Sequence, residues 1–151
     1  MIYGFALSLR KFLEDYMPEA KEVVLMRDGV TLTNRQKPFL TVEYLGSSDE
    51  LLASERTSYE EEYSYQVGIF ANNIAERLKL EGKVKTLLRR PDGIAYYSES
   101  LLDTGMRFYV DVSDFTPMTN DDTSNDTMNN RGYFDVSITI YRNTGETEFT
   151  Q

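Results

Sequence analysis

Residues 60–90 read EEEYSYQVGIFANNIAERLKLEGKVKTLLRR, and every other predicted element of this chain either pairs with this stretch or covers it. Its first part alternates between apolar and polar side chains, which is the period of a β-strand with one buried face. The residues on the apolar face are Tyr63, Tyr65, Val67 and Ile69. The sequence therefore predicts a half-buried strand that ends near Phe70 and leads directly into a helix.

The second part of the stretch carries the signals of a helix start and a helix stop. Asn72 or Asn73 offers a side-chain oxygen to the free N–H groups of a first turn, and Glu76 follows Asn73 at capping-box spacing. Pro91 marks the end. Gly82 predicts a kink, or two short helices in succession. Two apolar stripes are predicted to face the core: Ile74, Ala75 and Leu78, then Leu80, Val84, Leu87 and Leu88.

Composition excludes several classes of function. The 151 residues include no cysteine and no histidine, which removes disulfides, thiolate nucleophiles, histidine bases and the usual zinc ligands. A formal net charge of -9 opposes nonspecific attraction to nucleic-acid backbones and anionic membranes. No apolar run has the length of a membrane span, and the first residues lack a signal-peptide pattern, so we expect a single cytosolic domain over residues 1–151 with no membrane role.

The remaining elements are predicted from their periodicity. An amphipathic helix spans Phe5 to Tyr16, and Asp28-Gly29 predicts the turn of a small hairpin. Further strands are expected at 39–45, 94–97, 107–112 and 133–141, a solvated loop or exposed strand start at 46–61, and a polar tail at 142–151. The predicted fold class is α+β: a mostly antiparallel sheet of four or more strands, packed on one side by the N-terminal helix and the central helix.

Residues 115–132 are expected to form a flexible loop, because their Asp, Asn, Thr and Ser side chains bury little apolar surface. Its carboxylates invite a calcium interpretation, but no start at Asp121 or Asp122 gives the glycine and glutamate positions of an EF-hand loop. We therefore expect no metal site there.

No enzyme motif is recognised. Glu60, Glu61 and Glu62 are consecutive on one strand, whereas glycoside chemistry needs two carboxyl groups that face each other across a cleft. The basic residues Lys79 to Arg90 leave an alternative open, a small α+β nucleic-acid-binding module that uses the basic face of the 73–90 helix. The strands lack the aromatic signature of an RNA-recognition module.

Three stretches, residues 38–44, 65–78 and 133–140, together with the order of predicted elements, give the chain a resemblance. It resembles the tail-terminator and tail-to-head joining proteins of long-tailed bacteriophages and prophages. The resemblance implies a structural protein of the virion, made in the cytoplasm of the bacterial host, with no enzyme activity and no cofactor. It also implies a homohexameric ring at the head-proximal end of the tail that contacts the tail tube protein and the head connector proteins, with no direct nucleic-acid role.

Ring subunits need lateral surfaces that meet in a closing, head-to-tail fashion. Exposed tyrosines suit such surfaces because they supply large contact area at low entropic cost. We expect the acidic stretch and the long loop to contribute as well. The predicted interface residues are Glu60, Glu61, Asp121, Asp122, Asp126, Tyr109, Tyr133 and Tyr141.

Overall fold

The structure is a computed structural model that describes residues 1–52, 58–118, 130–143 and 149. These residues form two helices and seven strands. In chain order they are α1 (Ile2–Tyr16), β1 (Val23–Leu25), β2 (Phe39–Leu51), β3 (Ser58–Phe70), α2 (Ile74–Leu88), β4 (Ile94–Tyr97), β5 (Asp103–Phe108), β6 (Asp111–Pro117) and β7 (Arg131–Asn143).

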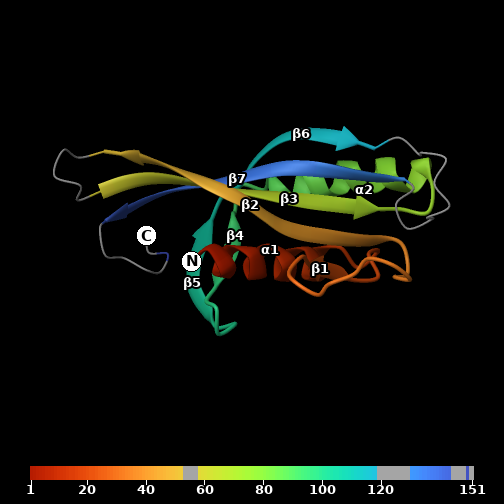
Figure 1. The fold of residues 1–151 in the computed structure, drawn as a ribbon, viewed down its shortest axis with the longest axis horizontal. Helices are drawn as coiled ribbons and strands as arrows, with labels where there is room; N and C mark the ends of the chain where they lie inside the picture. The colour runs from red at the N-terminus through yellow and green to blue at the C-terminus, as the bar shows by residue number, and fades with distance from the viewer. Residues whose placement is uncertain (53–57, 119–129, 144–148, 150–151) are drawn as a thin grey trace.

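The strands form a five-stranded sheet and a separate two-stranded ribbon (Figure 1). The order in the large sheet is β1-β2-β3-β7-β6, with β3 at the centre. β1 runs parallel to β2, and the other neighbours are antiparallel. β4 and β5 pair antiparallel with each other. The predicted α+β class, with a mostly antiparallel sheet of at least four strands, is confirmed.

One face of the sheet lies on the main hydrophobic core. The register places Val67 of β3 between Val42 of β2 and Phe134 of β7, and all three side chains are buried. The predicted alternation of β3 and β7 is therefore confirmed. Buried residues of both helices belong to the same cluster, among them Phe5 of α1 and Val84 of α2.

The other face carries a smaller cluster that replaces the predicted hairpin. Phe39 and Phe70 stack there with ring centroids 4.6 Å apart, and Val30 and Leu32 pack against this cluster. The small hairpin predicted around Asp28-Gly29 is wrong, because residues 30–32, which would be its second strand, cover the back of the sheet while β1 pairs in parallel with β2. Gly29 does form a turn, with φ of 82°.

α2 confirms the predicted start but not the predicted break. The Asn73 side chain accepts a 2.8 Å hydrogen bond from the Glu76 N–H, and the helix then continues through Gly82 without interruption. Ile74 and Leu78 are 55% and 56% exposed, so the prediction that the first apolar stripe faces the core is wrong. A helix on a sheet buries only one stripe, and in α2 the residues Leu80, Val84 and Leu88 form it.

β2 and β3 are longer than their apolar patterns predict. Each has 13 residues, and their pairing extends from Phe39↔Phe70 to Leu51↔Tyr59 with a bulge between Tyr44 and Gly46. Residues 46–61 were predicted as a solvated loop or an exposed strand start. The loop is wrong for 46–51, which belong to β2, and the strand start is found at 58–61, in β3. These ends lie beyond the helices, so alternation of buried residues fades while the backbone ladder continues.

The C-terminal third also departs from the expected boundaries. The expected strand 107–112 is divided between β5 and β6, which meet at Tyr109 and Val110, and residues 115–117 and 131–132 of the expected loop are strand. β7 includes the first two residues of the segment expected as a polar tail. Phe149, further along that segment, is buried with its ring 5.4 Å from Phe5 and 5.2 Å from Tyr96.

Candidate functional site

Three strand ends project past both helices and form what we call the arm: residues 45–51 of β2, 58–63 of β3 and 138–143 of β7 (Figure 1). At about 3.3 Å per residue, six residues of strand extend about 20 Å. Residues 44–51 of β2 have a strand neighbour on one side only among the described elements, because β1 pairs with β2 only up to Val42. The arm therefore leaves one backbone edge of residues 44–51 open to another chain.

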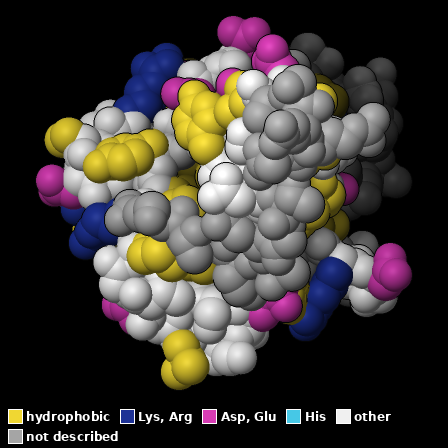
Figure 2. Space-filling model, turned by 90° about the vertical axis from the view of Figure 1, so that its left-hand side faces the viewer, with side chains coloured by type: hydrophobic (Ala, Val, Ile, Leu, Met, Phe, Trp, Pro, Cys, Tyr) yellow, Lys and Arg dark blue, Asp and Glu magenta, His cyan; other side chains and the backbone are white. Residues whose placement is uncertain are grey.

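The outer face of the arm is acidic. The register aligns Glu50, Glu60 and Tyr141 in one row across the three strands, and Glu62 lies in the next row. Glu50 and Glu62 are exposed, Glu60 is half-buried, and Tyr141 is 68% exposed. Figure 2 views this end of the molecule, where Asp and Glu side chains lie beside exposed hydrophobic ones.

The inner face of the arm holds a buried ion pair. Glu61 is buried, and one of its carboxylate oxygens lies 2.5 Å from Nη2 of Arg142, while the other accepts a hydrogen bond from the Tyr63 hydroxyl. Burial, and then the bond to Glu61, raise the pKa of Tyr63. Glu61 is thus turned away from Glu60 and has partners within the chain.

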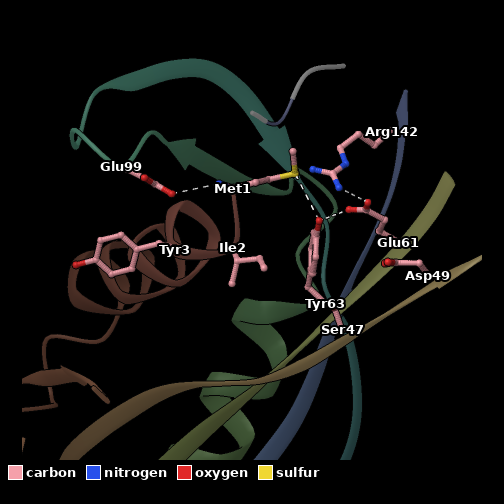
Figure 3. A pocket seen from close by; sticks show the side chains of 9 residues that line it. All are labelled: Met1, Ile2, Tyr3, Ser47, Asp49, Glu61, Tyr63, Glu99 and Arg142. Carbon is pink, nitrogen blue, oxygen red and sulfur yellow. Dashed lines mark hydrogen bonds and ion pairs between the residues drawn. The ribbon is translucent and has the colours of Figure 1, made fainter. Parts of the chain in front are cut away.

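A cavity of about 510 Å³ lies at the base of the arm (Figure 3). Arg142, Glu61 and Tyr63 point toward Met1 there, and the Met1 amino nitrogen lies 3.2 Å from Oε1 of Glu99. The lining residues are Met1, Ile2, Tyr3, Ser47, Asp49, Glu61, Tyr63, Glu99 and Arg142. Within the ranges that the structure describes, no group of three or more carboxylates is placed to hold a metal ion.

The other predicted interface residues lie in different places. Tyr109 is 62% exposed in the connection between β5 and β6, which precedes the pairing of Asp111 with Ser137 at the base of the arm, four residues along β7 from Tyr141. Tyr133 is half-buried on the back of the sheet, where its ring packs edge-on against Phe70 at 6.0 Å and burial raises its pKa. The structure therefore brings Glu60 and Tyr141 together and separates them from Tyr109 and Tyr133. Asp121, Asp122 and Asp126 lie outside the described residues.

The basic face of α2 is partly occupied by contacts within the chain. Lys83 forms a 2.6 Å ion pair with Glu19. Arg90 pairs with Asp92 at 3.4 Å, and its guanidinium lies 4.9 Å from the ring centroid of Tyr16. Lys79 is exposed and Lys85 is half-buried.

Sequence reasoning missed two components of the arm. Leu45 and Leu51 in the arm and Leu52 directly after it are 50%, 44% and 48% exposed, so this end of the molecule presents apolar surface as well as carboxylates. Three leucines inside a Ser, Asp and Glu rich segment were the available signal. The Glu61–Arg142 pair had no such signal, because it depends on the register of β3 against β7.

Comparison with known protein families and with curated proteins finds no match for this chain. Among the described residues, no helix combines the length and the apolar character that a membrane crossing requires.

Proposed function

We propose that this chain is a structural subunit of a long-tailed bacteriophage, a tail terminator or tail-completion protein. Its copies form a closed ring, a hexamer, at the head-proximal end of the tail tube. One side of the ring contacts the tail tube protein and the other contacts the head connector proteins. The proposal rests on the resemblance of residues 38–44, 65–78 and 133–140 to that family, and on the arm.

The arm is the observation that carries the proposal. The inner face of the arm buries Tyr63, Ile138 and Ile140, but its outer face stays in water and adds little to the stability of a monomer that acts alone. Exposed leucines and carboxylates on a projecting arm suit contact with another protein chain. In the proposed ring, each subunit keeps a sheet covered on one side by α1 and α2, which leaves the arm for its neighbour.

Solution mass and electron microscopy test the ring. We expect a purified sample to give the mass of a hexamer of the 17.4 kDa chain and closed rings in negative stain. Mixed with purified tail tube protein of the same phage, the rings should bind one end of the tube. A protein that stays monomeric at high concentration, with and without tube protein, would contradict the proposal.

The segment between β6 and β7 offers a second test. We propose that residues 121–129 contact a neighbouring subunit or the tail tube. Deletion of these residues should leave the monomer folded, as judged by circular dichroism, and should abolish ring formation or docking to the tube. If the deletion variant assembles and docks as the wild type does, this assignment of the segment is wrong.

The alternative, a nucleic-acid-binding module on α2, has weaker support because Lys83 and Arg90 already pair with carboxylates of the chain. Binding to single-stranded RNA at two salt concentrations separates the two functions. Steep loss of binding with added salt would favour the module, since each phosphate contact releases counterions. Absence of binding at low salt would remove it.

A further inference from the structure

The two ends of the molecule differ in charge. Arg142 is the sole basic residue of the arm and of the adjoining parts of the same three strands, residues 43–52, 58–66 and 135–143. It pairs with Glu61. α2 carries an excess of lysine and arginine over glutamate and lies at the opposite end of the sheet in Figure 1. One end is therefore acidic and the other contains a basic helix.

The exposed face of α2 has room for a partner. Its centre is formed by the small residues Ala75, Gly82 and Thr86, all of them exposed. A Cβ atom added at Gly82 would have no neighbour within 4 Å. Exposed Leu78 borders this centre on one side and Lys79 on the other, at helical spacing. The face thus combines a strip of small side chains with an apolar border and a basic border.

The arm has the matching chemistry. On the outer face of the arm, exposed Tyr141 can cover Ile74 and Leu78, and Glu50 and Glu60 in the same row can approach Lys79 and Lys85. Pairing of two arms with each other is disfavoured, because it brings carboxylates of both copies together, and like charges across an interface cost several kcal/mol. The charge distribution therefore favours a contact between the arm of one copy and α2 of another copy over a contact between two arms.

We propose that the arm of one copy docks on the exposed face of α2 in the next copy. This inference rests on the proposed ring and names the surfaces that build it. The contact is head-to-tail, since the two surfaces differ and lie at opposite ends of one molecule. Such a contact repeats from copy to copy and closes into a ring when its rotation is a whole fraction of a turn.

Charge exchange tests the inference. One variant carries Glu50→Lys with Glu60→Lys, and a second carries Lys79→Glu with Lys85→Glu. Each alone should reduce the fraction of rings about tenfold or more, since like charges then face each other. All four substitutions in one chain should restore assembly, and so should an equal mixture of the two variants. Native mass spectrometry measures all four samples.

Gly82 provides a matched pair of variants that does not depend on charge. Gly82→Ala and Gly82→Trp both extend into open space in the free subunit, so both should fold with at least wild-type stability in urea. Gly82→Ala should still form rings, whereas the indole of Gly82→Trp should block the arm and leave monomers. Glu14→Trp, at an exposed position on α1, is the control for an added aromatic ring and should assemble normally.

The outcomes separate this inference from the proposed function. If the wild type forms rings and the charge variants and Gly82→Trp also form them, the arm does not dock on α2, while the ring stands. If the two charge variants fail singly and the exchange does not restore assembly, the surfaces contribute but do not meet, which also overturns the inference. A wild type that never assembles overturns the ring and this inference together.

Discussion

At the scale of single residues, the buried carboxylate of Glu61 depends on a partner of opposite charge. Its partner Arg142 is about one-third exposed, with 32% of its side chain accessible. Removal of one member of a buried pair leaves a charge without compensation, which costs several kcal/mol at a fully buried site. We expect Arg142→Met to lower the free energy of unfolding by about 2 kcal/mol, a value reduced for the partial exposure, as measured by urea denaturation at pH 7.

The double variant Glu61→Gln with Arg142→Met is the control for that prediction. Glutamine keeps an oxygen that accepts the Tyr63 hydroxyl and carries no charge, so stability should return to within about 1 kcal/mol of the wild type. If both variants are equally unstable, loss of the Arg142 side-chain packing explains the effect and the ion pair does not.

Tyr65 predicts a loss of stability at alkaline pH. Its hydroxyl donates a 2.6 Å hydrogen bond to the Ile2 carbonyl, and burial raises the pKa of Tyr65 above that of an unfolded tyrosine, about 10. Below pH 10 the phenol is neutral in both states. Above it, the unfolded chain loses the proton first, so stability falls by up to about 1.4 kcal/mol per pH unit for this group.

Urea midpoints between pH 9 and pH 11 measure this slope. Tyr65→Phe should lower stability at pH 9, because the hydrogen bond is lost, and should give a shallower decline above pH 10. An unchanged slope in the variant would show that other groups cause the alkaline loss. Tyr63 contributes a slope of the same sign, since its pKa is raised as well.

At the scale of elements, the start of α2 depends on one cap. Asn73→Ala removes the acceptor for the Glu76 N–H and should cost about 1 kcal/mol in the free energy of unfolding. Asn73→Asp keeps an acceptor oxygen and should cost little. Thermal denaturation of the three proteins side by side measures both effects, and an equal loss in both variants would contradict a capping role.

Elements with strong periodicity were predictable, and elements that depend on tertiary partners were not. The strand from Tyr63, its continuation into α2 and the buried alternation of β7 follow from local pattern and capping chemistry. The parallel pairing of β1 does not, because a three-residue apolar strand is compatible with a hairpin as well. The outer half of β2 was missed, and that of β3 was predicted only as an alternative to a loop, because their ladder is made between polar residues, which a burial pattern cannot reveal.

At the scale of the whole molecule, opposite charge on the arm and on α2 predicts salt-sensitive assembly. Exposed charges farther apart than a Debye length are largely screened, and that length falls from about 30 Å at 0.01 M salt to about 3 Å at 1 M. We expect added salt to weaken the ring, so its dissociation constant should be about tenfold higher or more in 1 M salt than in 0.01 M salt. Light scattering at two salt concentrations measures it, and a tighter ring in high salt would indicate an apolar contact.

The candidate site was also predictable only in part, because strand register and tertiary packing decide which of its side chains are exposed. Glu60 and Tyr141 were chosen for their chemistry, and the register places them in one row. The choice of Glu61 ignored which face of the strand it occupies, and the choice of Tyr133 ignored the cluster around Phe70. The exposed face of α2 could not be identified from the sequence, because only the structure shows that Leu80, Val84 and Leu88 are the residues that pack toward the sheet.

The position of β7 between β3 and β6 has a consequence for biosynthesis. The central strand receives its second neighbour from β7, the last strand among the described residues, about 70 residues later in the chain. During translation β2 and β3 therefore emerge from the ribosome well before β7 is synthesised, and contacts of such long sequence separation form slowly. Until synthesis reaches residue 143, one edge of the nascent hairpin is open, so chaperones that shield unpaired strands should bind during that interval.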